Sequence, residues 1–167
     1  MNKLTKLQEN ELAYIAGFID GDGCINAQII RRVDYKLKFQ IRFSVTIIQK
    51  TSRHWVVLWF QKKLGCGQIR KRNDGISEYS LVGKNDVQNF LQLIKPFLKV
   101  KRRQAQLILE ICQQISKEQD PQSFVKLCER VDSIAKLNDS KKRIITSDVV
   151  RSILLNSVQK FPVETET

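Results

Sequence analysis

The segment from Tyr35 to Ile47 constrains the fold more than any other part of the chain. Its odd positions are apolar throughout, and its even positions are polar from Lys36 to Thr46. Strict alternation of this kind predicts a long strand with one buried and one exposed face. The preceding segment, Cys24 to Arg32, alternates compatibly, so the two predict an antiparallel hairpin that turns over residues 31–34.

The other segments extend this pattern into a mixed α+β domain. A second hairpin is predicted from residues 68–72 and 76–82, because Asn73-Asp74-Gly75 between strand-like runs is a strong turn signal. Helical spacing and capping residues predict helices over 52–64, 86–98, 101–115, 120–137 and 146–160. Residues 138–145 read as a basic loop. We expect one domain over residues 1–160 and a disordered tail over 161–167.

An apolar helix ending in carboxylates and glycines is predicted over residues 12–23. Ala13, Gly17 and Gly21 recur every fourth position and form a stripe where another backbone can approach closely. Asp20 and Asp22 follow at the C-terminal end, where the helix dipole disfavours each anion by roughly 0.3–1 kcal/mol. A divalent cation would offset that charge. A buried helix with a polar cap explains the glycines but not both acids together with the stripe.

The composition favours a nucleic-acid partner. The 167 residues carry a net charge of +12 and a pI near 9.7, whereas the apolar fraction of 42% is ordinary for a globular domain. Solubility or nonspecific binding to ribosomes would also account for the charge. The four cysteines lack metal or disulfide spacing, and His54 is the only histidine, which argues against histidine-centred nuclease chemistry. No transmembrane run, secretory signal or transit peptide is recognisable in the sequence.

The outward side chains of the two hairpins mix arginine, glutamine, asparagine and hydroxyl groups with few acids. Arginine and amide side chains are the preferred readers of guanine and adenine edges, and a two-stranded ribbon fits the major groove. A face made only for charge would consist mostly of lysine. The mixture therefore favours sequence-specific DNA recognition over a merely solvated sheet surface.

The run Ile15-Ala16-Gly17-Phe18-Ile19-Asp20-Gly21-Asp22-Gly23 resembles the signature of the LAGLIDADG homing endonucleases. The resemblance covers residues 12–106, and more loosely 137–146, and is strongest to short, single-motif members from organellar group I introns. It implies the family's αββαββα core, with an antiparallel sheet forming a DNA-binding saddle, followed here by C-terminal helices. It also implies a homodimer, because the motif occurs once.

The resemblance implies a catalytic set of Asp22, Gln49, Arg53 and Lys101. Asp22 and the carbonyl of Gly21 would bind Mg²⁺, Gln49 would position the attacking water, and Arg53 and Lys101 would stabilise charge on the phosphate. Asp20 would support the helix junction, although swapped roles for the two acids stay open. Taken alone, Gln49, Arg53 and Lys101 would each more often be an ordinary surface residue, but their joint presence at the family's spacing favours the functional roles. The implied dimer interface is Ala13, Ala16, Gly17 and Asp20.

The resemblance also implies DNA contacts from both hairpins and from the basic loop. Ile30 is the apolar member of this set and would contact a thymine methyl group. For the loop segment Ser140, Lys141, Lys142 and Arg143, a solvated basic surface explains the sequence nearly as well. The remaining expected DNA contacts are Gln28, Arg32, Tyr35, Lys38, Gln40, Arg42, Ser44, Thr46, Arg70, Arg72 and Ser80.

These features predict a homodimeric, Mg²⁺-dependent endonuclease that cuts both strands of a long pseudo-palindromic DNA site and so promotes homing of its host intron. We expect it in an organelle, a chloroplast rather than a mitochondrion. Three alternatives stay open: an RNA maturase of the same fold, a non-cleaving DNA-binding regulator, and a basic ribosome-associated protein. The intact Asp22, Gln49 and Lys101 weigh against the first, and the mixed arginine and glutamine face weighs against the last.

Overall fold

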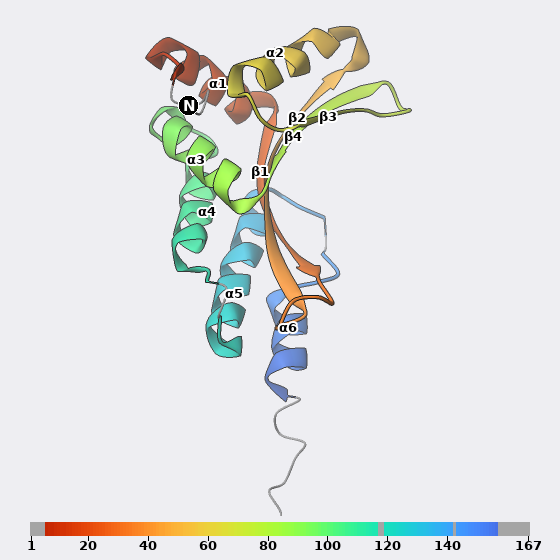
Figure 1. The fold of residues 1–167 in the computed structure, drawn as a ribbon, viewed down its shortest axis with the longest axis vertical. Helices are drawn as coiled ribbons and strands as arrows, with labels where there is room; N and C mark the ends of the chain where they lie inside the picture. Colours follow the sequence, from red (N-terminus) through yellow and green to blue (C-terminus); the bar gives the residue numbers. More distant parts are fainter. Residues whose placement is uncertain (1–5, 117–118, 142, 157–167) are drawn as a thin grey trace, which may run out of the picture.

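The computed structural model describes residues 6–116, 119–141 and 143–156. The chain forms a four-stranded sheet, and Figure 1 shows helices packed along it. The α-helices are α1 (Glu9–Asp22), α2 (His54–Leu64), α3 (Lys84–Ile94), α4 (Arg102–Gln114), α5 (Pro121–Leu137) and α6 (Ser147–Leu154), and the strands are β1 (Gly23–Arg31), β2 (Phe39–Lys50), β3 (Gln68–Lys71) and β4 (Ile76–Val82). Short 3₁₀ turns, η2 (Thr51–Arg53) and η3 (Lys95–Phe97), precede α2 and follow α3.

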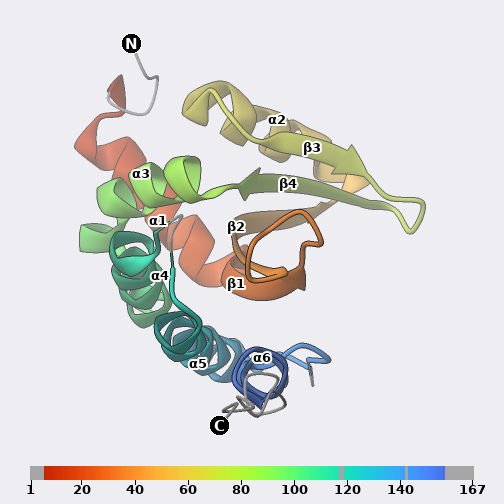
Figure 2. The same cartoon turned by 60° about the horizontal axis from the view of Figure 1, so that its bottom comes forward.

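The sheet is antiparallel throughout, in the order β1-β2-β4-β3. Alternate residues of β1 and β2, such as Ile25, Ala27, Phe43 and Val45, are buried beneath the helices. The alternating residues of the other face are exposed or half-buried. Figure 2 shows α1, α3, α4 and α5 in an arc on one side of the sheet. The predicted α+β class and the one-sided sheet are confirmed.

Helix α1 passes directly into β1 through a close backbone contact at Gly23. A Cβ atom there would lie 2.8 Å from the Cα of Ile19, which is closer than real Cβ contacts come. Glycine at this position lets the strand leave the helix at once. The junction therefore holds the acids at the end of α1 beside the first strand of the sheet.

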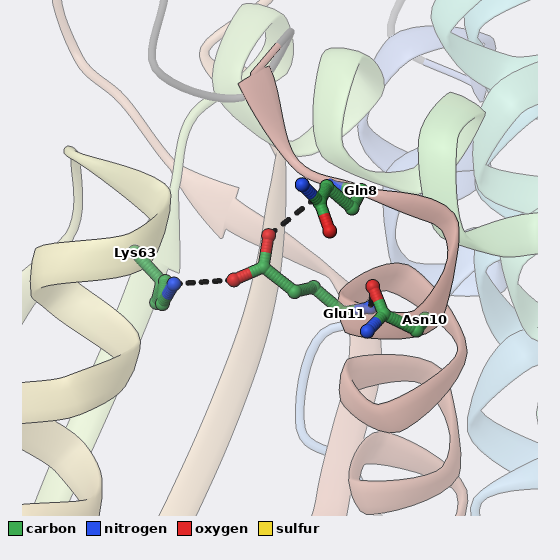
Figure 3. A network of polar contacts seen from close by, with 4 residues as sticks. All are labelled: Gln8, Asn10, Glu11 and Lys63. Atoms are coloured by element: carbon green, nitrogen blue, oxygen red, sulfur yellow. Dashed lines mark hydrogen bonds and ion pairs between the residues drawn. The ribbon is translucent and has the colours of Figure 1, made fainter.

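The other end of α1 is tied to α2. Glu11 accepts a hydrogen bond of 3.1 Å from the backbone N–H of Gln8 and forms an ion pair with Lys63 of α2, as Figure 3 shows. Along the same two helices, the rings of Tyr14 and Trp59 meet edge to face at 5.5 Å between centroids. Both contacts fix the direction of α1, and with it the position of its acidic end.

The loop between β1 and β2 is longer than predicted. The strand was expected to begin at Tyr35, but it begins at Phe39, and residues 32–38 form a loop closed by a hydrogen bond from Arg32 N to the Lys38 carbonyl. Lys38 adopts a left-handed backbone with φ 60°, which no strand residue can hold. The apolar residues at 35 and 37 continue the alternation into a loop segment that does not pair with another strand. The alternation therefore predicted a strand that is four residues too long at its start.

Smaller differences occur elsewhere. The predicted helix over 52–64 starts with η2, and the helix over 86–98 ends at Ile94 ahead of Pro96, which begins η3 with its neighbours. Asp120 caps α5 as expected, accepting from Ser123 N at 2.9 Å. Helix α6 ends at Leu154, and the rest of its expected span and the expected tail lie outside the described residues. None of the described helices has the length and apolar character needed to cross a membrane.

The free edge of β1 is covered by the loop between α5 and α6. Asn138 Nδ2 donates to the Ile25 carbonyl at 2.8 Å, and Arg143 Nη1 donates to the Ala27 carbonyl at 2.6 Å. The two carbonyls are two residues apart on β1 and point to the same edge of the sheet. The loop therefore satisfies edge groups that would otherwise be free to pair with another strand.

Candidate active site

Asp22 ends α1 with an exposed side chain, and Gln49 holds it from the sheet. Gln49 Nε2 donates to Asp22 Oδ2 at 3.1 Å from a side chain that is only 9% exposed. Gln49 lies near the end of β2, and the β1–β2 register brings the two chain segments together there. The structure thus joins two residues of the predicted catalytic set and leaves Asp22 Oδ1 without a hydrogen bond inside the described part of the chain.

Asp20 has a different environment from Asp22. Its carboxylate accepts the backbone N–H groups of Lys99 at 2.7 Å and Lys101 at 2.8 Å, at the start of α4. Burial alone would raise the pKa of Asp20, but these backbone hydrogen bonds together outweigh it and hold the pKa below its usual value. Asp20 therefore links α1 to the segment before α4, as predicted for a residue that supports the helix junction.

Lys101 packs against the same helix end. Its ammonium donates to the carbonyls of Ile19 at 3.0 Å and Asp20 at 2.6 Å. A cation among the last carbonyls of a helix offsets the negative end of the dipole. This explains how α1 tolerates two acids at its C-terminus, and it places the ammonium beside Gly21 and Asp22.

Arg53, the fourth predicted catalytic residue, is exposed in η2 just after β2. Its guanidinium has no ion pair or hydrogen bond among the residues that the structure describes. The next residue, His54, is anchored instead: its Nδ1 lies 2.9 Å from the hydroxyl of Ser77, which is fully buried and pairs across the sheet with Gln49. The contact between His54 and the buried Ser77 therefore restrains the backbone at the neighbouring Arg53.

The site offers few protein ligands for a metal. Within the described residues there is no cluster of three or more His, Cys, Asp or Glu side chains able to hold an ion. Asp22 provides one exposed carboxylate, and the exposed Gly21 provides a backbone carbonyl beside it. This donor set fits a hard cation that keeps several waters and takes few carboxylates, as Mg²⁺ does.

The small-residue stripe of α1 faces outward. Ala13, Gly17 and Gly21 are exposed, and a Cβ built on Gly17 or Gly21 meets no described atom within 4 Å. Packing within the described part of the chain therefore does not require glycine at positions 17 and 21. Ala16 departs from the expected interface, because it is fully buried in the core of the same chain, and Asp20 is occupied by its bonds to residues 99 and 101.

Most of the expected DNA-contacting residues share the open face of the sheet. The register pairs Gln28 with Arg42 and Ile30 with Gln40 between β1 and β2, and Thr46 with Ser80 between β2 and β4. Arg70 of β3 lies opposite Glu78 on the same face. This face extends over all four strands in the order β1-β2-β4-β3, so it offers a mixed donor and acceptor surface across the sheet, with the exposed Ile48 as an apolar member.

Several expected contacts are held within the loops. Arg32 pairs with Asp34 and lies over the Tyr35 ring, while Lys38 donates to the Val33 carbonyl at 2.8 Å. Tyr35 and Lys38 therefore lie in the hairpin loop and not on the predicted strand. At the other hairpin, Arg72 pairs with Asp74 at 2.7 Å.

The basic loop between α5 and α6 contains both exposed side chains and a side chain anchored to the sheet. Ser140 and Lys141 are exposed, whereas the half-buried Arg143 is anchored to β1, and Lys142 lies outside the described residues.

Comparison with known proteins decides the family. The family profile described as LAGLIDADG endonuclease matches residues 15–108 of this chain. The chain belongs to the LAGLIDADG endonuclease family. It is 46% identical over 144 residues to DNA endonuclease I-CvuI of Chlorella vulgaris, covering 86% of this chain and 89% of the relative. It is 42% identical over 151 residues to DNA endonuclease I-CreI of Chlamydomonas reinhardtii, covering 90% and 92%.

Solved structures of the LAGLIDADG family agree with the fold. I-CvuI in complex with the I-CreI target C1221 in the presence of magnesium, with the DNA not cleaved, superposes with a TM-score of 0.84 at 44% identity, over 89% of this chain and 94% of that one. I-CvuI with its target Sro1.3 in the presence of calcium gives 0.82 at 42% identity, over 93% and 96%. The archaeal endonuclease I-Vdi141I, at 22% identity and a TM-score of 0.75, shares the fold.

Two residues with clear structural roles near the site were absent from the predicted set. Ser77 supports the backbone of Arg53 through His54, and no spacing in the sequence signals that contact. Asn26 lies on the open face between Asp22 and Gln28, and the alternation of β1 already placed it outward. Its bond to Arg143 joins residues that are 117 positions apart, so only the folded chain shows it.

Proposed function

We propose that this protein is a homodimeric, site-specific DNA endonuclease that hydrolyses both strands of a long, near-palindromic duplex with a divalent metal, as a homing enzyme. The observation that carries the proposal is the exposed carboxylate of Asp22, held by Gln49 at one end of an open polar sheet face. Curated relatives at 42–46% identity are named as DNA endonucleases, and I-CvuI was crystallised on DNA targets.

Dimerisation is supported by the exposed stripe on α1. Ala13 and Gly17 present a flat, small-residue surface, and the neighbouring Tyr14 ring is 58% exposed. Packing this stripe against the same stripe of a second chain would let the two backbones approach closely and bury the tyrosine. Two such helices would bring two copies of Asp22 to one place, opposite the two strands of a duplex.

The metal chemistry follows from the limited donor set. Each chain would supply Asp22 and the Gly21 carbonyl, and the DNA phosphates and water would complete the ligands of the ion. A divalent cation held by these residues would supply Lewis-acid chemistry, activating water and stabilising charge on the phosphate. Gln49 would orient the carboxylate and a water, while Arg53 and Lys101 would contribute positive charge near the scissile phosphate. Mg²⁺ is the ion we propose.

The DNA-contacting role is proposed for the exposed polar residues of the sheet and for Ser140, Lys141, Lys142 and Arg143. An RNA maturase or a non-cleaving regulator would use the same basic face, but neither requires an exposed acid supported by a buried glutamine. The relatives come from two green algae, Chlorella vulgaris and Chlamydomonas reinhardtii. We propose that this chain acts in an organelle, and specifically in a chloroplast.

Cleavage of defined duplexes tests the proposal. The purified protein is incubated with duplexes carrying C1221, Sro1.3 or its own rejoined intron-insertion site, with Mg²⁺, with Ca²⁺ or with EDTA. We expect cutting at one position with Mg²⁺, no cutting with EDTA, and loss of cutting in Asp22→Asn with binding retained or tightened, because a negative charge near phosphate is removed. Tight binding without cutting in any divalent metal would favour the regulator, and preferential binding of the intron RNA would favour the maturase.

A further inference from the structure

Asn26 is held by a charged side chain from a distant part of the sequence. Arg143 Nη2 donates to Asn26 Oδ1 at 2.7 Å, and the same guanidinium donates to the Ala27 carbonyl at 2.6 Å. Asn138 Nδ2 donates to the carbonyl of Ile25, two residues before Ala27 along β1. Three hydrogen bonds thus fix the loop along the edge of β1, so Arg143 cannot swing away without breaking the loop's attachment.

The chemistry of Arg143 fixes which way the Asn26 amide points. A guanidinium carries only donors, so the amide oxygen must face it and the amide nitrogen must point away. The Asn26 Nδ2 atom has no hydrogen-bond partner among the described residues. Because no buried side-chain nitrogen or oxygen in that part of the chain lacks a partner, Nδ2 must be accessible to solvent. The amide therefore presents a fixed N–H₂ donor on the open face of the sheet, opposite Ser44 of β2.

The half-buried guanidinium also stays charged in this position. Burial lowers the pKa of Arg143, and the carboxylate of Asp132 opposes that change. Because an arginine has a very high pKa to begin with, it remains protonated at neutral pH. No carboxylate lies within ion-pair distance of it in the described part of the chain, and its two acceptors here are neutral.

We propose that Asn26 is a specificity-determining residue that reads one base pair in each half of the DNA target through its amide N–H₂ group, with Arg143 as the positioning residue that keeps this group a donor. The inference rests on the proposed DNA-binding function. Asparagine usually reads adenine with both its oxygen and its nitrogen. Here the oxygen already accepts from Arg143, so Asn26 selects a base edge that presents an acceptor, guanine O6/N7, thymine O4 or adenine N7, and disfavours the amino groups of cytosine N4 and adenine N6.

Base preference can be measured separately from affinity. Dissociation constants are determined for every single base-pair substitution of the duplex that the protein binds best among C1221, Sro1.3 and sequences selected from a randomised pool. Asn26→Asp keeps the shape of the side chain and its bond to Arg143, while it replaces the donor with an acceptor. We expect the preference at one base pair per half-site to invert by about tenfold toward cytosine or adenine, with the pattern elsewhere unchanged.

Two loop variants test the positioning role. Arg143→Met frees the amide to rotate and present its oxygen, so the same position should come to tolerate the amino groups of cytosine N4 and adenine N6 as well. Lys141→Met removes an equal charge from the same loop without touching Asn26, so it should weaken binding alike for all sequences. Urea unfolding of each variant checks that the domain is intact, and Asn26→Asp should unfold no earlier than wild type because it gains an ion pair with Arg143.

The outcomes separate this inference from the proposed function. An unchanged base pattern in a folded Asn26→Asp protein that still binds DNA would overturn the role of Asn26 and leave the DNA-binding function intact. If Arg143→Met and Lys141→Met changed the preference for each base pair in the same way, the positioning role of Arg143 would be overturned. Failure of the wild-type protein to bind any duplex would overturn both the proposed function and this inference.

Discussion

Gln49 Nε2 and Asp22 Oδ2 meet at 3.1 Å, although 27 residues separate them in the sequence. The glutamine is almost fully buried and the aspartate is exposed, so the sheet fixes the orientation of a carboxylate that solvent or a ligand can reach. A neutral donor can hold an acid in this way without cancelling its charge. This division of roles suits a carboxylate that must bind a cation and still point in one direction.

Replacing Gln49 should impair cleavage more than binding. In Gln49→Leu the carboxylate of Asp22 loses its donor, and a net hydrogen bond is worth roughly 1 kcal/mol, so we expect the single-turnover cleavage rate to fall about fivefold. Rapid-mixing cleavage assays with Mg²⁺ measure the rate, and filter binding in Ca²⁺ measures affinity. Equal losses in rate and affinity would show that Gln49 supports DNA binding instead.

Asp20 should matter for stability in a pH-dependent way. In Asp20→Asn the charged acceptor of two backbone N–H groups is lost, which we expect to lower the free energy of unfolding by about 1 kcal/mol at pH 7. Because folding lowers the pKa of Asp20, its contribution is present above the unfolded value near 3.8 and is lost as the pH falls through the folded value. Urea unfolding of both proteins at pH 7 and pH 3 should show the difference shrinking in acid.

Gly17→Leu should abolish the dimer without unfolding the chain. Among the described residues no atom lies within 4 Å of a Cβ built at Gly17, and leucine has a higher helix propensity than glycine by roughly 0.8 kcal/mol, so the monomer should be as stable or more so. Sedimentation equilibrium measures the oligomeric state. Asn89→Leu, at an exposed position on α3, serves as the control and should remain dimeric. A monodisperse Gly17→Leu dimer would contradict the packing of two α1 helices.

Binding should depend steeply on salt. Two chains of charge +12 give +24 for a dimer, and if six to ten of these cations meet phosphates, affinity should fall roughly 10³–10⁵-fold between 50 and 200 mM salt. Lys141→Met should reduce the magnitude of the slope of log K against log salt by about 2, because each of the two chains loses one phosphate contact. A salt-independent affinity would exclude backbone contacts as the main source of binding.

The sequence by itself determined the parts of the protein that depend on local periodicity and capping. Alternation predicted the two hairpins and their outward faces, Asn73-Asp74-Gly75 predicted the second turn, and the Asp120-Pro121 pair predicted the start of α5. The run from Ile15 to Gly23 resembled one family closely enough to predict that family, and the family profile confirms it; the catalytic residues that the resemblance implies stay a prediction. These features are readable because each depends on neighbours only a few positions away.

The tertiary structure decided everything that depends on residues distant in the chain. Ala16 is buried in its own core although it lies in the same motif as the exposed Gly17, because its side of α1 faces the sheet. The different surroundings of Asp20 and Asp22 arise from residues 99–101 and from Gln49, which approach the helix end only after folding. The donor orientation of Asn26 likewise depends on Arg143 from the far end of the chain. Hydrogen-bond partners at such separations are set by packing in three dimensions, which no local pattern of residues encodes.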